Sequence, residues 1–288
     1  MTARVSFVSR AKAVGGAVAW IVAFGLAGGA VSWMLIHVPA HPTPGWSLAW
    51  GALTTVVGFG FATWLVGHVL DRRAWESLGW RPRTGVGVGL AGGVASGAVM
   101  ALAAVALAAL AGHATVTADR GSGVGWGAVA VPLGSGLLLA ALAEELVFRG
   151  YPLRRLADAI GAGPATAVGA LGFGLVHLGN PNATTLSTVN VALAGVWLAC
   201  AFFSPGAMPL AWGAHFGWNA TLALGFDAPV SGYVFGIPAV DYHPGAHRWL
   251  DGGAFGPEGG IVATVVMLAG AAALLAWGRR AQPAPPLA

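Results

Sequence analysis

The chain has 288 residues, of which 57% are hydrophobic and only 8% are charged. Because soluble domains carry about 25% charged residues, this composition excludes an ordinary water-soluble fold and predicts a membrane-embedded one. The formal charge of +4 would suit a nucleic-acid partner in a soluble protein, but here the basic residues flank apolar runs, so no nucleic-acid partner is expected.

The apolar runs are about 20 residues long, which is the length of a helix that crosses a bilayer. Barrel strands would instead show short segments that alternate between apolar and polar residues. We therefore predict an all-α fold, a polytopic transmembrane helical bundle of about eight spanning helices. The expected spans are residues 13–38, 46–70, 85–112, 124–149, 162–178, 184–204, 206–226 and 260–278.

The first span follows Arg4, Arg10 and Lys12 in the manner of a signal peptide. Its apolar stretch is far longer than the roughly 7–15 residues of a signal-peptide core, so we expect it to stay attached as a helix. Residues 1–280 are expected to form a single transmembrane domain, with a motif-bearing core at about 124–226. The Pro-rich tail, 281–288, is expected to be disordered.

The basic residues predict the orientation, because short cytoplasmic loops hold an excess of Lys and Arg. With the N-terminus inside, only Arg120 and Arg248 of the 14 basic residues fall in outer loops. Both termini are therefore expected in the cytoplasm. The longest loop, 227–259, is then an outer loop. Cys200 is the only cysteine, which excludes an intramolecular disulfide and a cysteine zinc cluster.

Two adjacent acids, Glu144 and Glu145, interrupt the apolar run 137–149, whereas the other acidic residues fall in loops or at helix ends. A carboxylate inside a spanning helix normally pairs, protonates or does chemistry. Glu145 and Arg149 have the i,i+4 spacing of an ion pair, while Glu144 points about 100° away from Glu145. We infer that Glu144 stays free to face a water; the alternative is that both acids simply pair with Arg149.

Two of the eight histidines, His177 and His215, lie in apolar helical stretches. Phe173 lies one turn before His177, and Asn219 lies one turn after His215. A lone histidine in such a place is more often a satisfied core residue, but two of them, with Asn219 and the acid pair, favour a catalytic site. The other six lie near helix ends or in loops, where interfacial or solvated roles are expected.

These residue types are the parts of a water-activating amide hydrolase. Glu144 is a candidate general base, and a neighbouring histidine can hold the same water or protonate the leaving amine. His215 and Asn219 can donate hydrogen bonds to the oxyanion of a tetrahedral intermediate.

A metal site is the open alternative, since two histidines and a carboxylate also make a common catalytic zinc centre. Its ligands would be His177, His215 and either Glu144 or Glu145. The HExxH helix of zincin-type metalloproteases is absent, as are the motifs of rhomboid-type serine and presenilin-type aspartyl proteases.

The three blocks resemble the CAAX-protease and bacteriocin-processing (CPBP) family of intramembrane endopeptidases, which includes the Ras-converting prenyl-protein endopeptidase. That family carries EExxxR, FxxxH and HxxxN on separate transmembrane helices. Here the blocks are 144–149, 173–177 and 215–219, in the same order, and the resemblance covers about 140–226.

The resemblance implies an endopeptidase in which Glu144 activates a water with His177, and His215 and Asn219 form the oxyanion hole. Glu145, Arg149 and Phe173 would support the site. Members have been described both as metalloproteases and as metal-independent glutamate proteases, so the cofactor is either none or a single divalent metal such as zinc. The second description is favoured, because a third protein ligand is missing if Glu144 is the base.

The expected partners are the lipid bilayer and a membrane-associated protein or peptide substrate, with or without a lipid modification. The preference for Arg over Lys and the abundance of Ala and Gly predict a bacterial cytoplasmic membrane. Two other functions stay open. One is a non-catalytic immunity or binding factor on the same fold. The other is a proton-coupled transporter that uses the acid pair, although the sequence shows no repeated halves.

The depth of His177 poses a geometric question, because it lies at the outer end of its predicted helix while Glu144 lies toward the inner side. Residues 161–177 would span only about 25 Å, which is too short to cross the bilayer. We therefore expect the loop 178–182 to dip into the protein. Glu144, His177 and His215 are then predicted to converge within a few ångströms.

Overall fold

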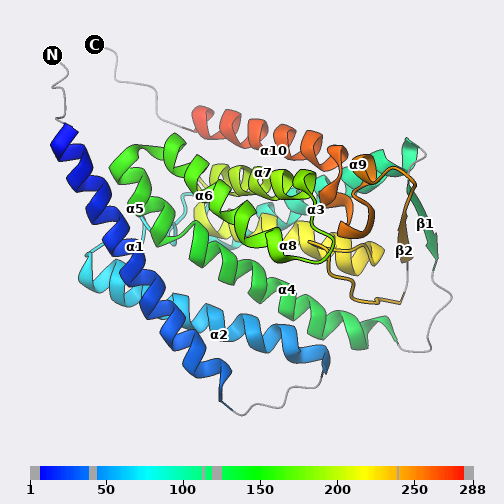
Figure 1. The fold of residues 1–288 in the computed structure, drawn as a ribbon, viewed down its shortest axis with the longest axis horizontal. Helices are drawn as coiled ribbons and strands as arrows, with labels where there is room; N and C mark the ends of the chain where they lie inside the picture. The colour runs from blue at the N-terminus through cyan, green and yellow to red at the C-terminus, as the bar shows by residue number, and fades with distance from the viewer. Residues whose placement is uncertain (1–6, 39–43, 112–113, 119–124, 239, 282–288) are drawn as a thin grey trace.

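The computed structural model describes residues 7–38, 44–111, 114–118, 125–238 and 240–281 (Figure 1). The helices run roughly side by side as one bundle. The predicted disordered tail lies outside the described residues except for Ala281, and so does Arg120 of the predicted outer loops.

Every predicted span is found as a helix, with ends within a few residues of those expected except at the start of the first. The second span continues beyond its α-helix as a π-helix, η2 (Thr63–Leu70). The corresponding helices are α1 (Phe7–Ile36), α2 (Ser47–Ala62), α3 (Val86–Leu110), α4 (Trp126–Phe148), α6 (Ala162–Val176), α7 (Thr185–Phe202), α8 (Ala207–Phe226) and α10 (Ile261–Arg280).

Seven described helical segments are long and apolar enough to cross a membrane, which makes the chain an integral, multi-pass membrane protein. The prediction of about eight differs by α8, which is not among the seven. Its 20 residues include Trp212, His215 and Asn219, which make it less apolar than its neighbours. Other helices surround α8 and bury much of its surface, so its polar side chains face protein rather than lipid.

A short helix that the sequence analysis did not predict, α5 (Tyr151–Ile160), follows α4 directly. Its sequence includes three charged residues. The helix lies at the end of the bundle where α1 begins (Figure 1). Arg73, in the loop after η2, forms ion pairs with Asp71 and with Asp158 of α5. The Tyr151 hydroxyl donates to Asp71 at 3.1 Å, so α5 is fastened to the neighbouring loop.

The range 227–259 was predicted as an outer loop, but its described residues include a strand and short helical turns. The strand β2 (Val240–Pro244) pairs antiparallel with β1 (Ala114–Ala118), and Val116 lies opposite Tyr242. The all-α prediction therefore holds except for this pair of five-residue strands. Short helical turns follow, namely α9 (Arg248–Asp251), η4 (Gly253–Phe255) and η5 (Pro257–Gly259).

Helices α3 and α8 approach each other closely through glycine residues. A Cβ atom on Gly97 would lie 2.1 Å from the Ala214 carbonyl oxygen, and one on Gly213 would lie 2.3 Å from that of Leu90. Only glycine allows two helix backbones to approach this closely, as small residues commonly do in membrane proteins. This contact fixes the position of α8, which carries His215 and Asn219.

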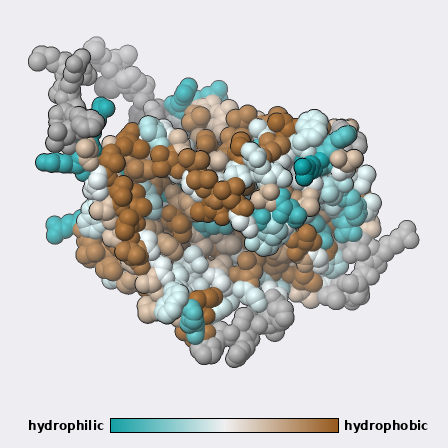
Figure 2. Space-filling view, viewed as in Figure 1, coloured by the Kyte–Doolittle hydropathy of each residue, from teal (hydrophilic) through white to brown (hydrophobic). Residues whose placement is uncertain are grey.

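The face of the bundle in Figure 2 carries extensive apolar patches, with polar areas between them. Large side chains such as Leu26 and Leu110 are 70% and 85% exposed. An apolar surface of this extent is expected where lipid is the solvent. The start of α1 and the end of α10 lie at the same end of the bundle, opposite β1 and β2 (Figure 1).

Candidate active site

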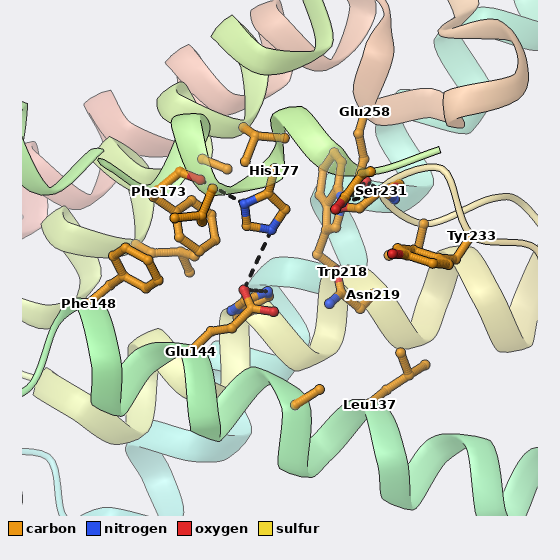
Figure 3. Close-up of a pocket in the computed structure, with 18 of the residues that line it drawn as sticks. Leu137, Glu144, Phe148, Phe173, His177, Trp218, Asn219, Ser231, Tyr233 and Glu258 are labelled. Atoms are coloured by element: carbon orange, nitrogen blue, oxygen red, sulfur yellow. Dashed lines mark hydrogen bonds and ion pairs between the residues drawn. The ribbon is translucent and has the colours of Figure 1, made fainter. Parts of the chain in front are cut away.

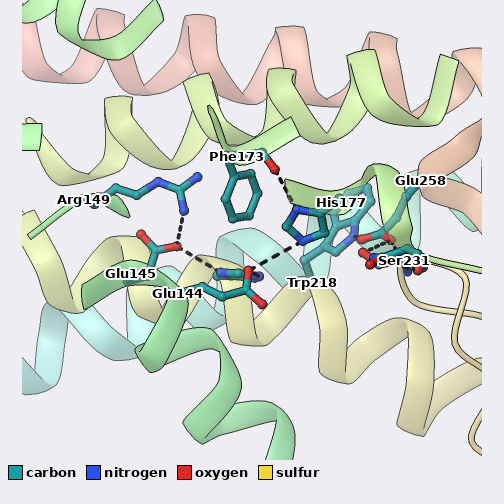
Figure 4. Close-up of polar contacts among 10 residues, drawn as sticks. Glu144, Glu145, Arg149, Phe173, His177, Trp218, Ser231 and Glu258 are labelled. Atoms are coloured by element: carbon teal, nitrogen blue, oxygen red, sulfur yellow. Dashed lines mark hydrogen bonds and ion pairs between the residues drawn. The ribbon is translucent and has the colours of Figure 1, made fainter. Parts of the chain in front are cut away.

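Glu144 on α4, His177 just after α6 and His215 on α8 come together inside the bundle. Figures 3 and 4 show Glu144 facing His177. Glu144 Oε2, on α4, lies 3.9 Å from His177 Nε2 and 3.7 Å from His215 Nε2. His177 follows the last turn of α6 and opens the 3₁₀ turn η3 (His177–Gly179), and His215 lies on α8. The predicted convergence within a few ångströms is confirmed.

Glu145, on the neighbouring face of α4, is held by two partners. Its Oε1 accepts a hydrogen bond from Arg149 Nη1 at 3.0 Å, as the i,i+4 spacing predicted. The same oxygen lies 3.0 Å from His215 Nδ1, a contact that the sequence did not predict. Because Glu145 and Arg149 are both fully enclosed, Glu145 orients the His215 ring while its own charge is compensated. Arg149 forms no ion pair with Glu144 within 4.0 Å among the described residues, contrary to the alternative of a simple shared pair.

His177 has a defined ring orientation. Its Nδ1 lies 2.7 Å from the Phe173 carbonyl oxygen, which can only accept a hydrogen bond, so Nδ1 carries the proton. In a neutral ring, Nε2 is then an acceptor that faces Glu144.

The Phe173 side chain packs between Arg149 and the His177 ring. Its ring covers the Arg149 guanidinium at 4.1 Å from the ring centroid and contacts the His177 ring at 4.7 Å. The Phe148 ring meets it edge-on at 5.1 Å. A cation over an aromatic face is attracted by the electrons of the ring. The side chain predicted to support the site therefore packs against both Arg149 and His177.

A cavity of about 450 Å³ opens in front of these groups. Glu144, His177, His215 and Asn219 line it, together with aromatic side chains that include Trp218. Among Glu144, His177 and His215, the Glu144 side chain is the most exposed, at 35%. A second cavity of about 370 Å³ lies between α2 and α4 and also reaches Glu144, so this carboxylate borders both.

The residues do not form a recognisable metal centre as they stand. Across the part of the chain that the structure describes, no group of three or more His, Cys, Asp or Glu side chains is arranged to hold a metal ion. The separations of 3.7 and 3.9 Å between Glu144 Oε2 and the two imidazole Nε2 atoms are wider than the roughly 3.3 Å between two ligands of a tetrahedral zinc. The metal-binding alternative therefore stays a prediction.

One buried acid was missed by the sequence analysis, which placed it among the loop residues. Glu258, in η5, is only 6% exposed and lines the same cavity. Burial raises the pKa of Glu258, and hydrogen bonds from Ser231 and Trp218 oppose that rise. The sequence contains one indication, because Asn190 is a polar residue inside an apolar run. In the structure its side chain hydrogen-bonds the Glu258 backbone. Neither residue belongs to a motif.

Comparison with known families agrees with the motifs. Residues 125–221 match the family model described as type II CAAX prenyl endopeptidase, Rce1-like. The resemblance inferred from the three sequence blocks is thereby confirmed for the region that carries them. No curated protein and no solved structure matches the chain.

Proposed function

We propose that this protein is an intramembrane endopeptidase of the glutamate type. One observation carries the proposal: Glu144 Oε2 lies within 4 Å of two imidazole Nε2 atoms in a cavity inside a membrane bundle. The match to a family of prenyl endopeptidases supports the same reaction class.

The separations suit a water shared by the three groups. At 3.7 and 3.9 Å, Glu144 is too far from either imidazole for a direct hydrogen bond. A water oxygen can bridge groups at this separation. Its two protons would point to Glu144 Oε2 and to His177 Nε2, since the latter is an acceptor when Nδ1 donates to Phe173.

In the proposed reaction, Glu144 removes a proton as the water oxygen attacks the carbonyl carbon of the scissile amide. The tetrahedral intermediate carries its negative charge on the former carbonyl oxygen. The C–N bond then breaks, and the proton held by Glu144 passes to the leaving amine, directly or through His177. The products are a free carboxyl group and a free amine, and the acid returns to its starting state.

His215 and Asn219 are assigned to the oxyanion. Because His215 Nδ1 faces the Glu145 carboxylate, Nε2 can donate to an oxyanion only when both ring nitrogens are protonated. The nearby carboxylates of Glu144 and Glu145 favour that charged ring. Asn219 lines the same cavity and offers an amide N–H. Each oxyanion donor is worth about 10²–10³ in rate in a known hydrolase.

The proposed substrate is a membrane-associated protein or peptide, with or without a lipid. The main cavity has an apolar lining apart from the polar groups described, which suits an extended peptide that enters from the bilayer. The proposed location is a bacterial cytoplasmic membrane. Sensitivity of the cleavage to a chelator distinguishes this mechanism from a metal-dependent one.

The decisive experiment is cleavage of fluorogenic peptides by the purified protein in proteoliposomes. The panel includes a farnesylated C-terminal CAAX-type peptide and its unprenylated counterpart. We expect Glu144→Gln and His177→Ala to lose cleavage with unchanged expression and folding. Glu76→Gln, which alters an exposed inner-side ion pair, should retain it.

Other outcomes point elsewhere. Wild-type activity in Glu144→Gln, or a cellular phenotype that this variant keeps, would favour the immunity or binding factor. Ion flux through the proteoliposomes would favour the transporter. Activity that survives a strong chelator is expected for the glutamate mechanism, whereas loss on chelation and recovery with zinc would favour the metal.

A further inference from the structure

The far wall of the main cavity comes from outside the matched region. The described residues of 227–260 (all except 239), here called the outer segment, fold over the end of the bundle beside β1. Ser231 and Glu258 of this segment line the cavity together with the catalytic candidates. Figure 4 shows both residues next to Trp218 and His177.

The Glu258 carboxylate is hydrogen-bonded at both oxygens. Its Oε1 accepts from Trp218 Nε1 at 2.8 Å. Its Oε2 accepts from the Ser231 backbone N–H at 2.5 Å and from the Ser231 hydroxyl at 3.0 Å. Burying a charge this deeply is costly unless such donors compensate it, so the carboxylate and its three donors depend on one another.

Both hydrogen-bonding partners of the Glu258 carboxylate, Trp218 and Ser231, lead to a segment that carries a proposed catalytic residue. Trp218 lies on α8 immediately before Asn219 and three residues after His215. The Ser231 carbonyl accepts from the side chain of Asn180 at 3.1 Å, and Asn180 lies three residues after His177. Glu258 therefore connects the His177 turn with α8 through Ser231 and Trp218.

The backbone around Ser231 is shaped for this contact. Ser231 adopts a left-handed φ of 49°, which is uncommon for a residue with a side chain. At the next residue, Gly232, a Cβ atom would lie 1.9 Å from the Pro181 carbonyl oxygen. The outer segment thus lies directly against residues 180–181, which follow the His177 turn.

Glu258 is itself anchored from α7. The side-chain amide of Asn190 donates to the backbone carbonyls of Glu258 and Gly260, both at 2.8 Å. Thr264, on α10, donates to the Asn190 side-chain oxygen at 2.6 Å. The carboxylate is consequently held at a fixed place relative to the membrane helices.

We propose that Glu258 is a positioning residue of the active site, and that the catalytic unit extends beyond residues 125–221 to include the outer segment. Through Ser231 and Asn180 it holds the turn that carries His177, and through Trp218 it holds the part of α8 that carries Asn219. This inference rests on the proposed endopeptidase function. It assigns Glu258 no direct contact with the reacting atoms.

The test compares two buried carboxylates in the same segment. Glu258→Gln keeps the shape of the side chain, but its NH₂ group cannot accept a hydrogen bond, so either Ser231 or Trp218 loses its acceptor. Asp251→Asn makes the matched change at a fully buried acid that accepts from the Gly245 and Gly253 backbone amides and does not line the cavity. Both variants are expected to lower stability.

Of these two substitutions, only Glu258→Gln is expected to impair catalysis. Misplacing catalytic groups by a fraction of an ångström lowers kcat, here by about 10-fold to 100-fold, while KM stays near the wild-type value. Asp251→Asn should keep the wild-type kcat per folded molecule. Ser231→Ala removes one donor and should lower kcat by a smaller factor. It also provides a milder variant if Glu258→Gln does not fold.

A second readout does not depend on cleavage. Amide hydrogen exchange across residues 177–182 should accelerate in Glu258→Gln and stay unchanged in Asp251→Asn. Wild-type kcat and exchange in Glu258→Gln, or equal effects of the two substitutions, would overturn the proposal. If the wild-type protein cleaves nothing, the endopeptidase function fails, while the exchange experiment still decides whether Glu258 holds the His177 turn.

Discussion

Arg149 and Glu145 place opposite charges in the interior of a membrane bundle, where solvation by water is absent. Their hydrogen bond at 3.0 Å, the Phe173 ring over the guanidinium and the contact of Glu145 with His215 together compensate the two charges. Removing one partner would leave the other charge buried and uncompensated, which is far more costly than losing the attraction alone.

We therefore predict that Arg149→Met lowers the free energy of unfolding by about 3–5 kcal/mol. The double variant Glu145→Gln/Arg149→Met should recover part of that loss, because no unpaired charge then remains. Denaturant unfolding in detergent, followed by tryptophan fluorescence, measures both.

Arg154→Met provides the control for this prediction. Arg154 pairs with Asp158 at 3.2 Å, also at i,i+4, but its side chain is 40% exposed. Exposed pairs contribute about 0–1 kcal/mol, so this substitution should have a small effect. If Arg149→Met and Arg154→Met lowered the free energy of unfolding equally, burial would not make the Glu145–Arg149 pair more important for stability than an exposed pair.

The residues of the site could be predicted from the sequence where the determining geometry is local. The Glu145–Arg149 pair follows from one helical turn, and the unusual polarity of Glu144 and His177 follows from the apolar runs around them. The contact of His215 with Glu145 depends on how α8 is rotated against α4, which no spacing within either helix determines. Glu258 was missed because its burial depends on the fold of the whole outer segment.

At the scale of elements, the position of α8 depends on how closely α3 approaches it. Gly97 and Gly213 lie where the backbones of these helices touch. Since α8 carries His215 and Asn219, a change in helix separation should affect the site as well as the stability.

We predict that Gly97→Ala lowers the free energy of unfolding by about 1–3 kcal/mol, the usual range for an overpacked contact, and also lowers kcat. The matched control is Gly92→Ala on the same helix. Its Cβ atom would meet only the end of the Leu210 side chain at an ordinary 3.8 Å. Because alanine is the better helix former by up to about 1 kcal/mol, Gly92→Ala should be neutral or stabilising. If Gly97→Ala changed the free energy of unfolding and kcat no more than Gly92→Ala does, the close approach of α3 and α8 would be contradicted.

The long helices were predictable because apolar runs of the right length have few alternatives in a bilayer. The short elements were not. α5 has only ten residues with three charged side chains, so its sequence resembles a loop. β1 and β2 have five residues each, which is too short for alternation to be distinguished from chance, and their pairing joins segments more than 100 residues apart.

For the whole molecule, orientation follows from the charges at the two ends of the bundle. The described arginines of the 71–83 loop, of α5 and of the end of α10 lie at the end where α1 begins, whereas Arg248 lies in the outer segment at the other end. Because basic residues are retained on the cytoplasmic side, the first end is expected inside. The outer segment, and with it Glu258, would then face the opposite side.

Cysteine labelling tests this orientation, with single cysteines placed in a Cys200→Ala background. In intact cells, a membrane-impermeant maleimide should label Ala246→Cys of the outer segment, which is exposed, and should miss Glu76→Cys, whose side chain is 54% exposed in the inner loop. Permeabilised cells should show both. Leu26→Cys is the informative control, because Leu26 is 70% exposed in α1 but faces the lipid under this arrangement, so it should stay unlabelled even after permeabilisation. Labelling of Glu76→Cys in intact cells would reverse the orientation, and ready labelling of Leu26→Cys would mean that water, not lipid, covers the apolar surface of the bundle.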